Sequence, residues 1–257
     1  MMFQKLPTLR VIDDTVTGIL HPVIEEVPIA VLVNGRHILT AMTSPVMLRE
    51  FVIGYLYTER IISSLEDIES IRIEDTKISV LTKNPFEILV SKKTVLSGCG
   101  GTSSFLDSTH LPHAPQGFVL SPGIIQAAVK AGLTSDLHIE TGGIHIVGLF
   151  NKEGAAIRIV EDIGRHNALD RAIGFALEAG IDLSETFVIC SGRISSEMAR
   201  KCLIAGIPIV ASRGATTTLA VAIAKQANLT LIGFVRSNKM NIYSGAERIT
   251  GTVMVPE

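Results

Sequence analysis

The last third of the chain repeats one pattern, in which a short apolar run is followed by a stretch with helical spacing. The apolar runs are TFVIC (186–190), IPIVAS (207–212) and LTLIGFV (229–235). The stretches between them, SSEMARKCLIAG (195–206) and TTTLAVAIAKQAN (216–228), place their apolar residues at helical intervals. Strands that alternate with helices at this spacing are joined by right-handed crossovers and form a parallel sheet. The pattern predicts an α/β domain whose sheet is covered by helices.

The sequence upstream predicts more strands and helices in a less regular order. VPIAVLV and RHILTAMT flank Asn34-Gly35, a pair that suits the positive φ angles of a hairpin turn. Ser44-Pro45 then provides an expected N-cap and first helical residue for the next segment. The other expected elements are strands at 68–74, 77–82 and 86–91, helices at 123–133 and 167–181, and a hairpin at 144–161. We expect an α+β protein overall, with a smaller N-terminal α+β unit at 1–115 and the α/β domain, with a mixed and largely parallel sheet, at 116–257.

Between these two parts the periodicity disappears for about 25 residues, in a stretch that contains LSGCGGTSSF (96–105). Cys99 lies there among three glycines, which leave a neighbouring side chain uncovered and allow the backbone to bend. Cys190 ends an apolar run and Cys202 lies within a helical one, so both are expected to be core residues. Cys99, on a mobile loop, is therefore the candidate reactive thiol.

Composition and charge exclude several classes of function. The formal net charge is −2, so no overall positive field attracts nucleic acid. No apolar run approaches the roughly 18 residues that cross a bilayer, and the first residues lack the apolar core of a signal peptide. The three cysteines are widely spaced and lack the clustered spacing of a zinc site. We therefore expect a cytoplasmic protein that binds neither nucleic acid nor membrane and holds no metal ion directly.

Each of the three apolar runs in the last third is followed by an arginine. Arg193, Arg213 and Arg236 occupy these positions, and Lys239 comes soon after the third. Any one of them alone fits an ordinary solvated surface residue. Ligands of parallel sheets bind beyond the carboxyl ends of the strands, where helix N-termini and arginine forks attract phosphate. The three together favour a phosphate or nucleotide site, although the glycine spacing of a known nucleotide fingerprint is absent.

Two histidines lie in unusual surroundings. His145 follows ETGG at the entrance to a strand, where it fits either a hydrogen-bonded hairpin residue or a catalytic one. His166 lies in EDIGRHNALD, among several charged residues, and is the better candidate for ligand contact. Asn167 and Asp170 fit either a helix N-cap arrangement or the ligand site.

Taken together, several segments resemble the FdhD-type formate dehydrogenase accessory proteins. The similar segments cover most of residues 25–248 and occur in the order of the family: VNGRHILTAMTSPVMLREFVIGYLYTERII, SGCGG, ETGGIHIVGLF, RIVEDIGRHNALDRAIG, CSGRISSEMARKCLIAGIPIVASRGATTTLAVAIAK and LIGFVRSNKMNIYSG. The resemblance implies a C-terminal domain of cytidine deaminase-like fold that lacks the zinc motif of the deaminases. It also implies a cytoplasmic sulfurtransferase that works through a cysteine persulfide, and a homodimer.

The implied reaction has two partners and one cofactor. A cysteine desulfurase supplies sulfur as a persulfide, and the sulfur passes to the molybdenum (or tungsten) bis(molybdopterin guanine dinucleotide) cofactor of formate dehydrogenase. This guanine-nucleotide-containing cofactor is a bound client. An alternative is a chaperone that holds the dinucleotide cofactor and carries no sulfur. A third and weaker alternative is a deaminase-like hydrolase.

The resemblance also assigns residues. The reactive loop of the family commonly reads C-x-x-C, and here Cys99 matches the first cysteine while Thr102 stands at the second. The cofactor-binding stretch of the family matches Phe234, Val235, Arg236, Ser237, Asn238 and Lys239. Arg193, Arg213 and His166 are expected to join this stretch in holding the phosphate and nucleotide groups.

Overall fold

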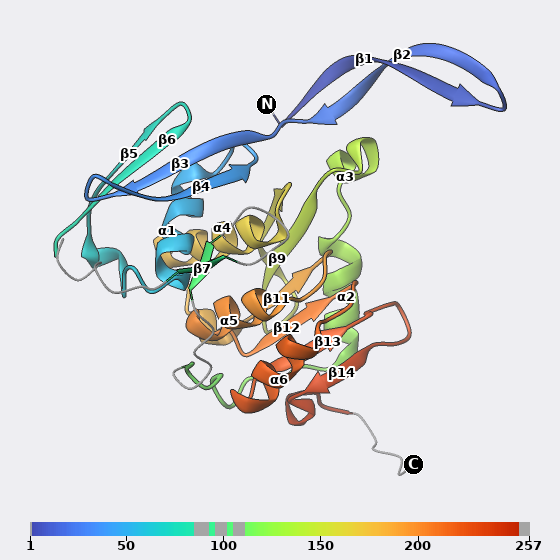
Figure 1. Cartoon of the computed structure of the whole chain (residues 1–257). Helices are drawn as coiled ribbons and strands as arrows, with labels where there is room; N and C mark the ends of the chain where they lie inside the picture. The colour runs from blue at the N-terminus through green and yellow to red at the C-terminus, as the bar shows by residue number, and fades with distance from the viewer. Residues whose placement is uncertain (1, 85–92, 96–101, 105–110, 252–257) are drawn as a thin grey trace.

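The centre of the molecule is a mixed six-stranded sheet (Figure 1). The computed structural model describes residues 2–84, 93–95, 102–104 and 111–251. Three central strands run parallel, and the strands outside them are antiparallel to their neighbours. The strand order is β10 (Ala156–Asp162), β9 (His145–Asn151), β11 (Thr186–Cys190), β12 (Ile209–Ser212), β13 (Thr230–Gly233) and β14 (Asn241–Ser244). This arrangement confirms the predicted mixed sheet with parallel strands β11, β12 and β13.

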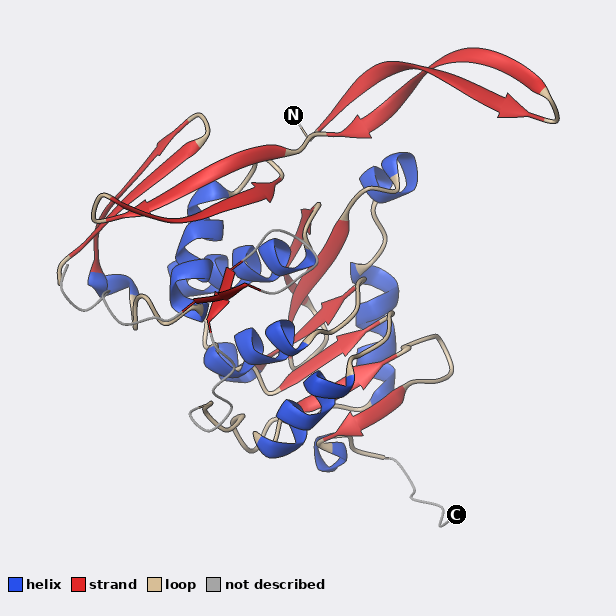
Figure 2. Cartoon of the chain, in the orientation of Figure 1, coloured by secondary structure: helices blue, strands red, loops and turns tan. Residues whose placement is uncertain are grey.

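Helices cover both faces of this sheet (Figure 2). Because successive side chains of a strand point to opposite faces, β11 contributes to two cores. Val188 and Cys190 pack with α4 (Arg165–Glu178), α5 (Ser196–Ile204) and α6 (Thr218–Gln226), while Phe187 and Ile189 pack with α2 (Pro122–Gly132). All five residues of β11 are buried, as a central strand between two helical layers requires. The short α3 (Asp136–Thr141) leads into β9, and 3₁₀ turns occur at Leu183–Glu185 and Ala246–Arg248.

The N-terminal unit is a second sheet with one helix. Its strand order is β4 (Arg36–Thr43), β3 (Val27–Val33), β6 (Lys77–Thr82) and β5 (Ile68–Glu74), and a 3₁₀ turn at Leu65–Asp67 precedes β5. The predicted hairpin is confirmed, with Asn34 and Gly35 at positive φ in the turn. The helix α1 (Leu48–Thr58) packs on this sheet, but the predicted N-cap is wrong. Met47 occupies the N-cap position, whereas the backbone N–H of Ser44 donates to Asp162 Oδ2 at 3.0 Å.

Two further pairs of strands complete the described chain. The strand β7 (Lys93–Val95) pairs antiparallel with β8 (Thr102–Ser104). The strand expected at 86–91 and the reactive residue Cys99 lie outside the described residues. The boundary expected near residue 115 stays a prediction.

The first residues form an arm that the sequence analysis did not predict. The strands β1 (Phe3–Ile12) and β2 (Thr15–Ile24) pair along their whole length and project from the body (Figure 1). Directly paired residues share a face, so Leu9, Val11, Val16 and Leu20 lie on one face of the arm, and all four are exposed. The arm meets the body near its base, where Ile24 lies against Gly143.

The N-terminal unit is held to the C-terminal domain by a close contact between α1 and α4. A Cβ atom on Gly54 would lie 1.8 Å from the carbonyl oxygen of Asp170, and one on Gly174 would lie 1.9 Å from that of Glu50. Only glycine permits helix backbones to approach this closely. These two glycines therefore set the distance between the two parts of the molecule.

Two buried ionic clusters strengthen the same junction. In the first, Arg171 and Asp162 form an ion pair with fully buried side chains. The guanidinium of Arg171 also donates to the carbonyl oxygens of Val46 (2.9 Å) and Ser44 (2.7 Å), and Thr43 Oγ1 donates to Asp162 at 2.9 Å. Buried charges require this degree of pairing and hydrogen bonding. The loop that leads into α1 is thus fixed to β10 and α4 of the C-terminal domain.

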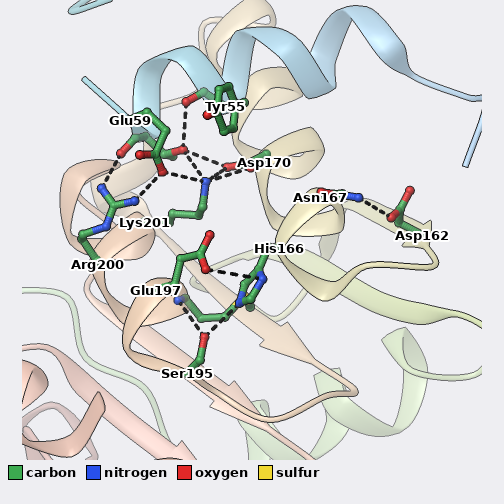
Figure 3. A network of polar contacts seen from close by, with 12 residues as sticks. Tyr55, Glu59, Asp162, His166, Asn167, Asp170, Ser195, Glu197, Arg200 and Lys201 are labelled. Carbon is green, nitrogen blue, oxygen red and sulfur yellow. Dashed lines mark hydrogen bonds and ion pairs between the residues drawn. The ribbon is translucent and has the colours of Figure 1, made fainter. Parts of the chain in front are cut away.

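The second cluster joins α1, α4 and α5 (Figure 3). Lys201 Nζ donates to both carboxylate oxygens of Asp170, at 2.9 and 2.8 Å, and to Thr58 Oγ1 at 3.0 Å. Glu59 lies 3.4 Å from Lys201 and forms a second ion pair with Arg200. Burial alone would lower the pKa of Lys201, but the carboxylates of Asp170 and Glu59 raise it above its ordinary value. The ammonium of Lys201 therefore stays charged inside the protein.

Candidate functional site

One edge of the six-stranded sheet collects the segments that the sequence analysis selected. The strands β11, β12 and β13 end there. Because β9 is antiparallel to both neighbours, its register pairs Val147 with Cys190 and His145 with Asp162, which brings the start of β9 and the end of β10 to the same edge. The helices α4, α5 and α6 follow β10, β11 and β12 and begin at this edge. Their N-terminal N–H groups give the edge a partial positive charge.

Backbone hydrogen bonds join the three loops that follow the parallel strands. Ile194 N–H donates to the carbonyl of Ala215 at 2.9 Å, and Phe234 N–H donates to that of Gly214 at 2.9 Å. The loops can run this close because Gly214 lacks a side chain: a Cβ atom there would lie 3.2 Å from the carbonyl carbon of Gly192. The edge is therefore one continuous backbone surface.

The three predicted arginines all reach this surface. Arg193 and Arg213 are exposed, each in a loop that leads to a helix N-terminus. Arg236 is also exposed, and its guanidinium donates to the carbonyl oxygens of Arg213 (2.7 Å) and Val235 (2.9 Å). Nη1 of Arg236 is the donor in both bonds, which hold the planar guanidinium at the surface. An arginine fork held at the surface in this way has the geometry that suits an anion.

The stretch from 234 to 239 presents most of its side chains to solvent. Phe234 has a positive φ of 54° and is 40% exposed, an unusual arrangement for an aromatic residue. Val235 is fully buried in the core beside α2, so this position reaches a ligand only through its backbone. The other four residues, Arg236, Ser237, Asn238 and Lys239, are exposed, and Arg236 N–H closes the turn by donating to the Lys239 carbonyl at 2.8 Å.

His166 lies in the first turn of α4 and faces the start of α5 (Figure 3). Its Nε2 is 2.9 Å from Ser195 Oγ, and its Nδ1 is 3.6 Å from Glu197 Oε2. Burial, together with the positive charges of Arg165 and Lys201, lowers the pKa of His166 to about 3. The imidazole is consequently neutral at physiological pH. The structure thus brings His166 to the same edge as the three arginines.

Arg165 and His145 also lie at this edge, although the sequence analysis did not select Arg165 and left His145 open. A Cβ atom on Gly192 would lie 2.9 Å from the His145 ring and 3.4 Å from Arg165 Cδ, so both side chains pack over this glycine. Arg165 Nε is buried and has no hydrogen-bond partner among the described residues. Burial and the charge of Arg165 lower the pKa of His145. The sequence signal for Arg165 was its position at the start of a helix that follows a strand.

Asn167 and Asp170 have structural roles in place of the N-cap roles considered. The helix α4 begins at Arg165 with Gly164 at its N-cap. Asn167 Nδ2 donates to the Met42 carbonyl at 2.9 Å and to Asp162 Oδ1 at 3.0 Å. Asp170 is buried in its cluster with Lys201. Both residues fix α4 against the N-terminal unit.

The remaining cysteines have the positions expected of core residues. Cys190 and Cys202 are free and buried, and burial raises the pKa of Cys190 to about 11 and raises that of Cys202 as well. Among the described residues there is no group of three or more His, Cys, Asp or Glu side chains that could hold a metal ion. In the described part of the chain, no helix is long and apolar enough to cross a membrane.

Comparisons with known proteins agree with one another. The sequence profile of the FdhD/NarQ family matches residues 24–250. Proteins named "Sulfur carrier protein FdhD" from Staphylococcus aureus strains MRSA252 and JH9 are each 33% identical to this chain over 254 residues, covering 95% of it and 95% of the relative. A crystal structure described as that of "a putative formate dehydrogenase accessory protein from Desulfotalea psychrophila" superimposes with a TM-score of 0.80 at 28% identity, covering 97% of this chain and all of the other.

Proposed function

The chain belongs to the FdhD/NarQ family, and we propose that it is a sulfur carrier for the maturation of a formate dehydrogenase. The names of its relatives support this general role, because they describe sulfur carrier proteins and a formate dehydrogenase accessory protein. In detail, the protein takes sulfur from the persulfide of a cysteine desulfurase and delivers it to the molybdenum or tungsten bis-guanine-dinucleotide cofactor. The observation that carries the proposal is the cationic strand edge, which suits the phosphates of such a client.

The edge matches the chemistry of a dinucleotide in two ways. Pyrophosphate oxygens are stabilised by helix N-termini and by arginine forks, and this surface offers the starts of three helices together with Arg193, Arg213 and Arg236. Phe234 adds an exposed aromatic ring beside them, which suits stacking against a purine base. His166, Ser237, Asn238 and Lys239 supply further polar contacts around the same loops.

Cys99 is the sulfur-carrying residue in this proposal. Its thiolate attacks the outer sulfur of the donor persulfide, which forms Cys99–S–SH and releases the donor cysteine as a thiolate, with no net change in oxidation state. Delivery of the outer sulfur as sulfide requires two electrons. A second cysteine would supply them by forming a disulfide, but the corresponding position is Thr102. An external thiol reductant therefore supplies these electrons.

The decisive experiment is to incubate the protein with a cysteine desulfurase and cysteine and then to analyse it by mass spectrometry. We expect one added sulfur on the peptide that contains Cys99, removable by cyanide. Cys99→Ala should remove the adduct, whereas Thr102→Cys should load and then lose sulfur faster, because a neighbouring thiol resolves the persulfide. Loading that persists in Cys99→Ala would refute the assignment of this residue.

The alternative, a chaperone that holds the cofactor without carrying sulfur, is favoured by Thr102 standing where the family has its second cysteine. Calorimetry with GDP as a fragment of the cofactor separates the two functions. Arg236→Ala should weaken GDP binding by about 1–3 kcal/mol, as for loss of a charged hydrogen bond. Lys225→Ala, at an exposed position in the last turn of α6, is the matched control. Tight GDP binding combined with no sulfur loading would favour the chaperone.

The named partners and the location follow from the same proposal. A cysteine desulfurase as donor, formate dehydrogenase as client, a homodimeric assembly and a cytoplasmic location stay predictions. Light scattering on the purified protein tests the assembly, and co-purification with each candidate enzyme tests the partners.

A further inference from the structure

Ser195, His166 and Glu197 form a chain of contacts that the sulfur-carrier function does not use. Ser195 is the N-cap of α5, Glu197 lies in the first turn of the same helix, and His166 reaches them from α4. Ser195 Oγ lies 2.9 Å from His166 Nε2, and Glu197 Oε2 lies 3.6 Å from His166 Nδ1 (Figure 3). A hydroxyl, an imidazole and a carboxylate in this order are the parts of an activated nucleophile.

The neighbours of His166 favour one direction of proton transfer. A carboxylate only accepts, so Glu197, 3.6 Å from Nδ1, favours the tautomer of the neutral imidazole that carries its proton on Nδ1. The other nitrogen, Nε2, is then an acceptor for the Ser195 hydroxyl. Ser195 Oγ already accepts a bond from the Met198 N–H at 3.3 Å, which leaves its own proton to be donated to Nε2. In this state His166 is the base and Ser195 the group that it deprotonates.

The set is accessible and lies in a cationic environment. The side chains of His166 and Glu197 are 21% and 22% exposed, and Ser195 is half-buried. The charged and titratable groups around His166 are Arg165 on its own helix, Lys201 and Arg200 on α5, His145 on β9, and the carboxylate of Glu197. Because all of these groups except Glu197 lower the pKa of His166, they disfavour a protonated imidazole, and the positive charges among them favour an anionic substrate.

A separate observation indicates that a ligand belongs here. Arg165 Nε is buried without a hydrogen-bond partner among the described residues, and a buried donor in this state is costly. Arg165 packs over Gly192, in the loop that runs from β11 to Ser195. An anion held beside this loop would pair with Arg165 and lie close to the Ser195 hydroxyl.

We propose that Ser195 is a nucleophile for phosphoryl transfer, activated by His166 and Glu197, and that its substrate class is a phosphoanhydride such as the diphosphate of a nucleotide. Ser195 Oγ attacks phosphorus, so that a new O–P bond forms as the anhydride P–O bond breaks. The hydroxyl proton passes to His166 Nε2, and the leaving phosphate departs with the bonding electron pair. Water then hydrolyses the phosphoserine, so the net reaction is hydrolysis of the anhydride without oxidation or reduction.

The basicity of His166 depends on whether an anionic substrate is bound. Without an anion, burial and the surrounding cations keep His166 from holding a proton. A bound diphosphate offsets the charge of Arg165, and Glu197 faces the Nδ1–H of the imidazolium that forms. The charge that develops on the phosphoryl oxygens is stabilised by Arg165 and by the N–H groups at the start of α5. The base is thus strengthened by the substrate itself.

A fluorophosphonate probe, which phosphonylates activated serines, tests the nucleophile without sulfur, a desulfurase or the client cofactor. The result is therefore independent of the proposed sulfur transfer. We expect one adduct, located at Ser195 by tandem mass spectrometry and absent from Ser195→Ala. His166→Gln should slow labelling by about 100-fold, as for loss of a general base. Glu197→Gln should slow it less, and Ser196→Ala, at the adjacent residue, is the matched control with unchanged labelling.

The substrate class is tested by phosphate release from GDP and from inorganic pyrophosphate. Release from either compound that is lost in both Ser195→Ala and His166→Gln supports the proposal, and no release from either would overturn the phosphoanhydride assignment. Labelling should stay constant between about pH 5 and pH 9, because His166 is neutral throughout this range. The absence of an adduct at Ser195, or an adduct whose rate is the same in His166→Gln, would overturn the nucleophile and leave Ser195 as a helix cap only.

Discussion

Replacement of Lys201 by methionine should show how much the second buried cluster contributes to the stability of the molecule. Lys201 is 1% exposed and makes two bonds to Asp170, one bond to Thr58 and an ion pair with Glu59. Methionine keeps most of the length and apolar volume, so the packing changes little. The variant leaves the Asp170 carboxylate buried with Thr58 as its remaining hydrogen-bond partner in the cluster. Breaking a buried pair in this way costs about 3–5 kcal/mol.

A double-mutant cycle separates the ion pair from other effects of the substitution. Asp170→Asn removes the charge that Lys201 neutralises, so the double variant Asp170→Asn/Lys201→Met should cost less than the sum of the two single variants. Lys225→Met, at an exposed position on α6, is the control and should change the free energy of unfolding by at most about 0.5 kcal/mol. Because the chain has no tryptophan, urea unfolding is best followed by far-ultraviolet circular dichroism.

The stability lost in Lys201→Met should also depend on pH. Burial raises the pKa of Asp170 to about 6, while Lys201 and Thr58 act to lower it. Removing Lys201 therefore raises this pKa further above its value in the unfolded chain. A group with a raised folded pKa stabilises the fold at low pH, and this contribution is lost as the pH rises through the folded pKa. The deficit of Lys201→Met should be smaller at about pH 5 than at about pH 8. A loss below about 1 kcal/mol, or the same loss at both pH values, would refute this reasoning.

Three other predictions follow from particular contacts. Gly54→Ala should destabilise the protein by about 3 kcal/mol or more, because the new Cβ would overlap the Asp170 carbonyl, and this cost outweighs the better helix propensity of alanine. Gly18→Ala is the control in the same urea titration, since its new Cβ would have no atom beyond its chain neighbours within 4 Å. Cys190 and Cys202 should stay unmodified by iodoacetamide in the native protein and react only after denaturation, because both are buried with raised pKa values. Thr217→Val should lower the free energy of unfolding by about 1 kcal/mol, since Thr217 Oγ1 accepts the Ala220 N–H as the N-cap of α6, and a loss near zero would contradict this role.

The sequence predicted the elements whose signals are local. The apolar runs and the turn residues that flank them located β5, β6 and β11 to the residue, because both signals are local to the segment. The arm was missed for a local reason as well. Its turn consists of Asp13 and Asp14 at positive φ instead of a recognisable Asn-Gly pair, and prolines interrupt both of its strands.

The candidate site was predicted in part for similar reasons. Parallel strands end at one edge by topology alone, so the placement of Arg193, Arg213 and Arg236 together could be expected from their positions after strands. The role of Asp170 could not, because its partner Lys201 is 31 residues away and the contact depends on how α4 meets α5. Contacts of this kind arise from the packing of helices, which no local pattern records.

The arm has a consequence for how this protein compares with its relatives. The family profile begins at residue 24, which is the last residue of β2. The arm therefore lies almost entirely before the region by which the family is defined. Apart from Ile24 at its base, which packs against the core on the α2 face of the six-stranded sheet, the arm contributes no residue to the described cores of the two sheets. Substitutions along the exposed part of the arm should therefore leave the strand edge and its arginines in place.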